Sequence, residues 1–421
     1  MENSFYSAFD EASIPDRQAD DYRNSFEVDR DRIIHTSAFR RLQAKTQVFQ
    51  SGEYDFYRTR LTHSIEVGQI GRSICSYLKK SSEHLGEDFY VDPNLVEAVC
   101  LSHDLGHPPF GHNGEKTLNR LMRPYGGFEG NAQTLRLLTE TIYSDLKKRS
   151  GMRPTRALLD GVLKYKSLYS ERDNPPNHFL FDDQKPYLDF VFDDHDLESK
   201  LPGHKAKNSF KSLECQIMDW ADDTAYSIHD IADGIRAEFI TIDKLERWAS
   251  SVELGSDESG HVESVISIIR KGNVDAMLGI KIGEFIQTSS LQERSNFMSE
   301  KTNRFRFELK VDPAKQRESE LYKRIAYEIV FLSTRVKQLE YKGDSMLERL
   351  FEALLENYTE KGGNPPRLVS PKLEKRLKAV DTVTEKARLL CDYLAGMTDS
   401  FAIKTYRRLF DPGFGSIVDI V

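Results

Sequence analysis

The stretch DPNLVEAVCLSHDLGHPPFGHNGE, residues 92–115, is the most informative part of this chain of 421 residues. Asp92 followed by Pro93 indicates the start of a helix, because aspartate caps the first amide groups and proline fits the first helical turn. Gly106 and the pair Pro108–Pro109 indicate where that helix stops. The stiff turn after it must return beside the helix end. It brings together three histidines and two acids, which are His103, Asp104, His107, His112 and Glu115. Solvation alone explains such a cluster poorly, so the sequence predicts a functional site here.

Segments on both sides of this stretch repeat apolar residues at the spacing of a helix. They span residues 29–49, 60–80, 212–235, 320–341, 345–358, 385–397 and 399–410. Patterns typical of strands are scarce, and YLDFVFD (187–193) is the best strand candidate. The predicted fold class is therefore all-α, a helical core with an additional helical C-terminal lobe.

The same patterns predict how the chain is divided. We expect a short N-terminal tail over 1–28, a helical core over 29–240, and a helical C-terminal lobe over 241–421 that packs on the core. Residues 170–210 contain many turn formers, which predicts a long surface excursion from the core. The string DDHD (193–196) lies in that excursion, and we interpret it as a solvated acidic loop.

Composition narrows the classes of function. The net charge is −8, with a pI near 5.9, so the surface as a whole does not favour nucleic-acid binding. The basic cluster of Lys404, Arg407 and Arg408 is compatible with a local binding site for single-stranded DNA, although the overall charge does not support one. No signal peptide and no membrane-spanning run are evident, and the cysteines are scattered, so we expect a cytoplasmic protein with reduced thiols.

A metal site is the chemistry that these residues favour. His63 lies on one predicted helix, His103 and Asp104 end a second, and an acidic cluster lies on a third. Imidazole and carboxylate groups together suit a divalent first-row metal, and facing helices of a bundle are a usual place for one. The acidic cluster offers Asp219, Asp222 and Asp223, and the spacing to Tyr226 and Asp230 fits either of the last two aspartates. Periodicity does not choose between them.

Some of these residues, taken singly, also suit an ordinary structural role. Glu115 also suits the first turn of a helix, where an acid interacts favourably with the helix dipole. Tyr226 also suits an ordinary core position. The remaining histidines His35, His84, His178 and His204 follow no spacing that indicates a site.

The pattern H…HD…D is the signature of the HD phosphohydrolase superfamily, and longer strings resemble its dGTP triphosphohydrolase family. These strings are FRRLQAKTQVF (39–49), TRLTHSIEV (59–67), HDLGHPPFGHNGE (103–115), FEGNAQTLRLL (128–138), LLDGVLKYK (158–166), DWADDTAYSIHDIADG (219–234) and DYLAGMTDSFA (392–402). They occur in order from about residue 29 to residue 410. The resemblance is weaker over 170–210 and 240–330. It implies an HD-domain core.

The resemblance also implies roles for residues. The metal ligands would be His63, His103, Asp104 and the first aspartate of ADD, which is Asp222, and the ion Mg²⁺, Mn²⁺ or another first-row metal. His112 would be the general acid–base, as base or as acid, with Glu115 orienting it. The implied substrate contacts are Arg60, Lys164 and Asn131 to the phosphates, Gln47 to the sugar and base, Tyr226 against the 2′ position, and Asp230 to the 3′-hydroxyl.

The resemblance further implies a hydrolase that converts a deoxynucleoside triphosphate, with dGTP favoured, to deoxynucleoside and tripolyphosphate. It also implies a homo-oligomer, and the oligomer that the family suggests is a hexamer. One alternative is an HD-type phosphodiesterase or 5′-nucleotidase, although a binuclear phosphodiesterase usually needs more histidine ligands between HD and the last Asp. An alternative of another class is a nucleotide-sensing or nucleic-acid-binding module. The sequence fixes neither the base preference nor the metal.

Overall fold

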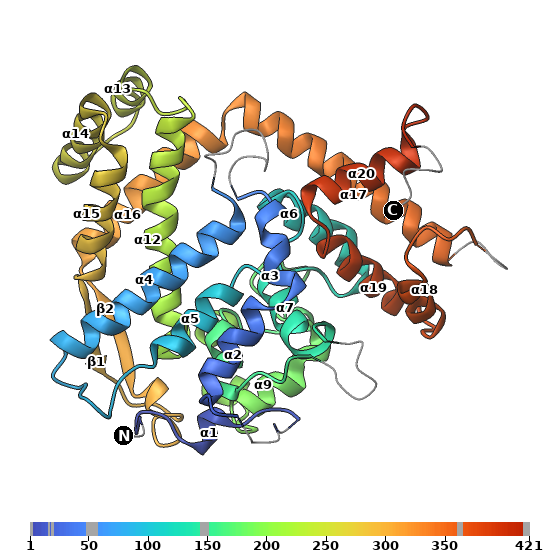
Figure 1. Ribbon diagram of the computed structural model, residues 1–421, viewed down its shortest axis with the longest axis horizontal. Coiled ribbons are helices and arrows are strands. Elements are labelled where there is room, and N and C mark those ends of the chain that lie inside the picture. The colour runs from blue at the N-terminus through green and yellow to red at the C-terminus, as the bar shows by residue number, and fades with distance from the viewer. Residues whose placement is uncertain are drawn as a thin grey trace.

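The computed structural model describes residues 3–15, 17, 21–47, 58–143, 151–359 and 365–415. These residues are mainly helical, with one sheet of two short strands, which confirms the predicted all-α class (Figure 1). Val48 and Phe49 of the string FRRLQAKTQVF lie outside the described residues. No helix in the described ranges is both long and apolar enough to cross a membrane.

The N-terminal part of the fold builds the helices that carry the predicted site. Its helices are α1 Ala8–Glu11, α2 Ser25–Ile34, α3 Ser37–Arg41, α4 Arg60–Ser81, α5 Pro93–Ser102, α6 Gly111–Met122, α7 Gly130–Arg136, α8 Arg156–Val162, α9 Lys185–Val191, α10 Leu197–Lys200, α11 Gly203–Ser209 and α12 Leu213–Arg236. The cap of α5 is as predicted: Asp92 accepts hydrogen bonds from the amides of Asn94 and Leu95, and Pro93 occupies the first turn.

The C-terminal part adds helices at both ends of the molecule. They are α13 Ile242–Ser251, α14 Ser256–Lys271, α15 Val274–Ile286, α16 Pro313–Ile325, α17 Thr334–Thr359, α18 Pro371–Lys378, α19 Val383–Ala395 and α20 Asp399–Phe410. In Figure 1, α13 and α14 lie at one end and α18 to α20 at the other, and the long helix α17 runs toward the latter group. A π-helical turn, Ala326–Phe331, follows α16 and leads toward α17.

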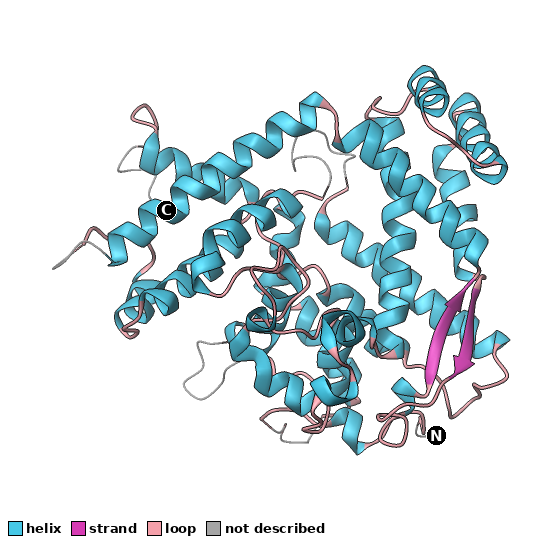
Figure 2. Cartoon of the chain, turned by 180° about the vertical axis from the view of Figure 1, so that it is seen from behind, coloured by secondary structure: helices cyan, strands magenta, loops and turns pink. Residues whose placement is uncertain are grey.

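The strand prediction for residues 187–193 is wrong. Most of this segment belongs to α9, which begins at Lys185 with Pro186 in its first turn. Leu188 and Val191 are buried three residues apart, which is the spacing of one helix face. The strands lie elsewhere: β1 Ser289–Glu293 pairs antiparallel with β2 Phe307–Val311 (Figure 2).

Two hydrophobic clusters hold the molecule together, and each draws on both sides of the predicted boundary at residue 240. The first joins α4, α5 and α12 to α13, α14, α16 and β2. The second joins α6, α7 and α9 to α17 and α19. Phe5 and Tyr6 belong to the first cluster, so the segment predicted as an N-terminal tail contributes to the core. The domain boundaries stay predictions.

The segment 170–210 does more than loop over the surface. It forms three short helices, α9 to α11, and its side chains Phe179, Phe181 and Phe192 are fully buried in the second cluster. The four cysteines are buried as free thiols. Cys75, Cys100 and Cys215 belong to the first cluster and Cys391 to the second.

Candidate active site

Four proposed metal ligands converge from three helices. His63 lies on α4, His103 and Asp104 follow the end of α5, and Asp222 lies on α12. The Nε2 atom of His63 is 3.1 Å from Oδ1 of Asp222 and 4.0 Å from Oδ2 of Asp104. The Nε2 atom of His103 is 3.6 Å from the same Asp222 oxygen and 3.4 Å from Oδ1 of Asp104. Ligand atoms of His63, His103 and Asp104 all lie within 4.8 Å of one another, close enough to share one ion.

The protonation of this cluster also suits a cation. The Nδ1 atom of His103 donates to the carbonyl of Cys100 at 2.6 Å, which leaves Nε2 as the lone-pair nitrogen. That buried Nε2 atom has no hydrogen-bond partner among the described residues. Burial lowers the pKa of His63, which keeps its imidazole neutral. Burial alone would raise the pKa of Asp104, but Arg60 and then His103 lower it well below its usual range.

The aspartates of α12 have different surroundings. Asp222 is the member of the cluster that lies beside both histidines. Asp219 pairs with Lys211 at 2.6 Å and with Lys164 at 3.2 Å. Asp223 pairs with Lys323 of α16 at 2.8 Å and does not line the cavity described below. This geometry favours Asp222 as the proposed ligand.

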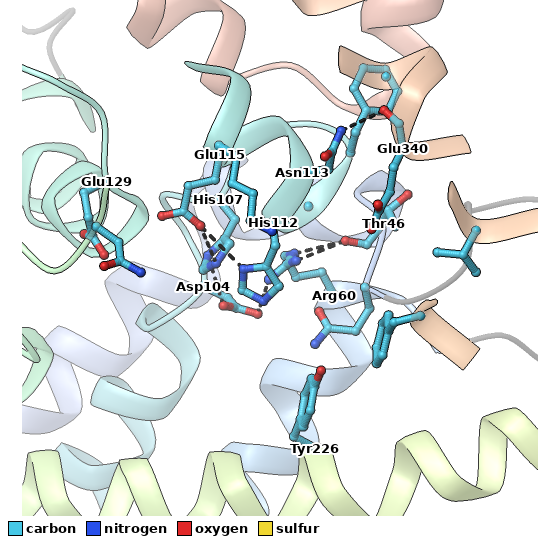
Figure 3. Close-up of a pocket in the computed structure, with 18 of the residues that line it drawn as sticks. Thr46, Arg60, Asp104, His107, His112, Asn113, Glu115, Glu129, Tyr226 and Glu340 are labelled. Atoms are coloured by element: carbon cyan, nitrogen blue, oxygen red, sulfur yellow. Dashed lines mark hydrogen bonds and ion pairs between the residues drawn. The ribbon is translucent and has the colours of Figure 1, made fainter. Parts of the chain in front are cut away.

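A turn with unusual backbone angles leads into the proposed acid–base pair, His112 and Glu115, which Figure 3 shows side by side. Phe110 and Gly111 both have positive φ, at 64° and 59°, and α6 begins at Gly111. The Nδ1 atom of His112 lies 3.5 Å from Oε2 of Glu115, and the Nε2 atom of His107 lies 3.7 Å from the same oxygen. The other Glu115 oxygen accepts the amide of Gly130 at 2.7 Å. The glutamate is thus fixed between two imidazoles.

These groups line one cavity of about 680 Å³, a volume typical of small-molecule sites. The turn and the proposed ligands contribute to its lining. One wall comes from the C-terminal part, with Phe331 and Glu340 among its residues, and another from the segment 176–178. The cavity also contains every proposed substrate contact except Asp230, namely Gln47, Arg60, Asn131, Lys164 and Tyr226.

The proposed phosphate contacts are held by charged or polar neighbours. Arg60 is buried, and its Nη1 atom donates to Oδ2 of Asp104 at 2.7 Å. Lys164 Nζ lies 3.3 Å from Oδ2 of Asp222. Asn131 donates to Glu129 at 2.9 Å. The buried Oε1 atom of Gln47 has no hydrogen-bond partner in the part of the chain that the structure describes.

The structure separates the two proposed sugar contacts of α12. Tyr226 lines the cavity, with its ring parallel to that of Phe331 and the centroids 6.3 Å apart. Asp230 is buried away from the cavity, where Arg58 donates to its carboxylate. Burial raises the pKa of Asp230 to about 7, although Arg58 opposes that shift. Eight residues along a helix span about 12 Å, so the stripe from Asp222 reaches beyond the cavity.

Several cavity residues were not predicted from the sequence. Glu129 is buried beside Glu115, and burial followed by this neighbouring charge raises its pKa to about 8. His178 stacks on Tyr165 with the ring centroids 4.1 Å apart, although its sequence position indicated no role. The string FEGN offered a signal for Glu129. Nothing local indicated that Phe331 or His178 would reach the cavity, because tertiary packing brings them there.

The basic cluster of the C-terminal part lies on α20. Lys404 and Arg407 are exposed, and Arg407 is paired with Asp411 at 3.4 Å. Ile403 of the same helix lines the cavity. Binding of single-stranded DNA, which the overall charge does not support, stays an untested alternative.

Comparison with known proteins gives two family matches and a set of close relatives. The HD domain family matches residues 60–227, and the phosphohydrolase-associated domain family matches residues 309–408. A deoxyguanosinetriphosphate triphosphohydrolase-like protein of Shewanella loihica is 36% identical over 95% of this chain and 96% of its own length. A protein of Deinococcus radiodurans named deoxyguanosinetriphosphate triphosphohydrolase-like protein 2 is 37% identical over 95% of each chain.

Proposed function

This chain belongs to the deoxyguanosinetriphosphate triphosphohydrolase-like family of HD-domain phosphohydrolases, and we propose that it hydrolyses deoxynucleoside triphosphates at the α-phosphorus. The chain is thus an enzyme that acts on phosphoric ester bonds. We propose dGTP as the favoured substrate, and deoxynucleoside and tripolyphosphate as the products. The observation that carries this proposal is one nucleotide-sized cavity that contains the HD cluster, the His112–Glu115 pair and the cations Arg60 and Lys164.

The metal would be held by His63, His103, Asp104 and Asp222, and we propose Mg²⁺ or Mn²⁺. The lowered pKa of His63, the lowered pKa values of Asp104 and Asp222, and the unpartnered Nε2 atom of His103 together support this mixed set of nitrogen and oxygen donors for a divalent ion. When bound, the ion supplies Lewis-acid activation of the α-phosphate and lowers the pKa of a nearby water.

The chain's own cations would balance the charge of the phosphates. Arg60 and Lys164 already lie beside proposed metal ligands, at 2.7 Å from Asp104 and 3.3 Å from Asp222. Phosphoryl transfer is catalysed mainly by such positioning and electrostatic stabilisation. Asn131 adds an amide to the lining of the same cavity.

His112 would move the proton. Its side chain is 65% exposed and lines the cavity, so substrate or water can reach it. Glu115 lies beside its Nδ1 atom, which leaves Nε2 to face the reacting atoms. The imidazole could take a proton from water or give one to the departing 5′-oxygen.

The sugar would be recognised at α12. Tyr226 limits the space available for a 2′-hydroxyl. Asp230 keeps one buried carboxylate oxygen, Oδ2, without a hydrogen-bond partner among the described residues, and we retain the 3′-hydroxyl as its proposed partner. That contact would require Arg58 or the α12 side chains to shift, since Asp230 does not line the cavity.

The test is product analysis. The purified protein is incubated with each of the four deoxynucleoside triphosphates and with GTP, in the presence of Mg²⁺ or Mn²⁺, and the products are separated by chromatography. We expect intact tripolyphosphate and deoxynucleoside. Release of orthophosphate in place of tripolyphosphate would contradict the proposal and favour a 5′-nucleotidase or phosphodiesterase. Sedimentation analysis of the same sample tests the predicted homo-oligomer.

A further inference from the structure

A carboxylate of the C-terminal part holds two cavity-lining segments together. Asp399, the first residue of α20, is 1% exposed. Its Oδ2 atom accepts the backbone amide of Thr46 at 2.8 Å and also accepts the Thr46 hydroxyl. Its Oδ1 atom accepts the backbone amide of Phe110 at 2.9 Å. The two segments are 64 residues apart in sequence, and one side chain joins them.

The first segment leads directly to the proposed metal site. The carbonyl of Thr46 accepts Arg60 Nε at 3.3 Å and Nη2 at 3.1 Å. The third guanidinium nitrogen, Nη1, donates to Asp104. A continuous series of hydrogen bonds therefore runs from Asp399 through Thr46 and Arg60 to Asp104, a proposed ligand. Figure 3 shows the part from Thr46 to Asp104.

The second segment is the turn that delivers the proposed acid–base pair. Phe110 has a positive φ, which costs a bulky residue energy and persists only when the surroundings hold it. Gly111 is packed closely, since a Cβ atom there would lie 3.3 Å from the Thr46 carbonyl and 3.4 Å from Arg60 Nη2. His112 follows immediately. The hydrogen bond from Phe110 to Asp399 is thus placed to hold the backbone that positions His112.

Helix capping does not explain Asp399. The cap of α20 is Thr398, whose side chain accepts the amide of Phe401. All three hydrogen bonds to Asp399 come from outside α20. A second connection also joins the C-terminal part to the residues that follow α5. The buried Lys45 donates to the carbonyl of His107 at 2.5 Å and to that of Ala395 at 2.9 Å. Ala395 is therefore connected through Lys45 to His107, which lines the cavity as Thr46 and Phe110 do.

We propose that Asp399 is a positioning residue for the hydrolytic reaction, which aligns Arg60 through Thr46 and His112 through Phe110. The part of this inference that concerns kcat and KM rests on the proposed function. It also gives the string GMTD a physical role, as the point where the C-terminal part completes a site whose reacting groups all belong to the N-terminal part.

The test compares Asp399→Asn with a matched variant. Asparagine keeps the size of the side chain but turns an NH₂ group toward one of two backbone N–H donors. A misplacement near 1 Å can cost about 100-fold in rate, so we expect kcat to fall about 10- to 100-fold, with a smaller change in KM. The control is Asp392→Asn on α19, since Asp392 is a partly buried carboxylate that likewise joins the C-terminal part to α7, through Arg136 at 3.0 Å and Gln133 at 3.0 Å. Neither of these partners lines the cavity, so kcat should be unchanged.

Hydrogen–deuterium exchange gives a readout that does not depend on turnover. The amides of Thr46 and Phe110 should exchange faster in Asp399→Asn, and at the wild-type rate in Asp392→Asn. Thr46→Val serves if Asp399→Asn fails to fold, because it removes only the hydroxyl contact and should give a smaller loss of kcat. An unchanged kcat in Asp399→Asn, an equal loss in the control, or unchanged exchange at both amides would each overturn the proposal. Wild type that turns over no nucleotide would refute the proposed function instead, while the exchange rates still decide whether Asp399 orders the two segments.

Discussion

Arg58 and Asp230 form a buried ion pair, although 172 residues separate them in the sequence. Arg58 precedes α4 and Asp230 lies on α12, so the pair connects the two helices that carry His63 and Asp222. The guanidinium also donates to the carbonyl of Ala225 at 3.2 Å. The pair therefore helps to fix the relative position of two proposed ligands.

Loss of Arg58 should destabilise the protein strongly. Arg58→Met leaves the buried Asp230 carboxyl without its cation, and breaking a buried pair from one side typically costs about 3–5 kcal/mol. Thermal and urea unfolding measure the loss. The double variant Arg58→Met, Asp230→Asn should recover part of it, because position 230 then carries no charge, while Asp233 and Glu66 still lose Arg58 as an ion-pair partner. Additive effects of the two substitutions would show that the pair contributes little.

Removal of a proposed ligand should abolish both metal binding and turnover. Asp222→Ala is the most informative case, because Asp223→Ala is a matched control on the next residue of the same helix. Asp223 pairs with Lys323 instead of facing the histidines. Metal content after dialysis and hydrolysis of dGTP are measured on both. Activity retained in Asp222→Ala and lost in Asp223→Ala would reverse the assignment.

His112→Ala should separate chemistry from binding. We expect the variant to retain the metal and to bind nucleotide, while kcat falls by a factor on the order of 10² or more, the scale of general acid–base catalysis. Glu115→Gln should lose activity as well. Ligand atoms of His107, His112 and Glu115 also lie within 4.8 Å of one another. Loss of bound metal in His112→Ala would therefore identify this group as a ligand set.

Sugar selectivity should depend on Tyr226. If the ring blocks the 2′-hydroxyl, Tyr226→Ala admits GTP to some extent while loosening the hold on dGTP. A 2′,3′-dideoxynucleotide should be a worse substrate for wild type, because it lacks the 3′-hydroxyl proposed to contact Asp230. A buried acceptor that loses its hydroxyl partner costs roughly 1–3 kcal/mol. The measurement is kcat/KM for dGTP, GTP and dideoxy-GTP. Equal kcat/KM values of wild type for GTP and dGTP would contradict the proposed exclusion of the 2′-hydroxyl by Tyr226.

Glu129 should make stability depend on pH. Its pKa in the folded protein is raised to about 8, above the ordinary value of 4.5, because burial and then the Glu115 charge favour the protonated form. The stabilisation from this proton is complete below pH 4.5 and is lost as pH rises through 8. Glu129→Gln cannot ionise, so its free energy of unfolding should rise relative to wild type across that interval. Urea unfolding at several pH values checks this, and parallel curves would contradict it.

Local sequence signals predicted the parts of the fold that depend on backbone geometry. The Asp92–Pro93 cap lies where the sequence placed it, and the turn with its positive φ at Gly111 follows α5 as expected, but α5 ends at Ser102, four residues before the predicted stop at Gly106. The strand prediction at 187–193 failed because buried apolar residues suit either a strand or a short helix.

Side-chain partners from distant segments were beyond such signals. The helical period placed Asp222, Tyr226 and Asp230 on one stripe, but it could not reveal that Arg58 would arrive to pair with the last of them. His178 likewise reaches the cavity only because the segment around it packs into the second hydrophobic cluster. Tertiary packing, which no local pattern encodes, decides both cases.

The burial of the cysteines gives the protein internal probes of its own unfolding. A thiol-reactive dye can modify these side chains only after the surrounding helices separate, so at high dye concentration the rate of modification equals the rate of opening. Cys215 lies in the first cluster and Cys391 in the second. Variants that keep one of the two therefore report, separately, whether the region around α12 or the region around α19 opens first.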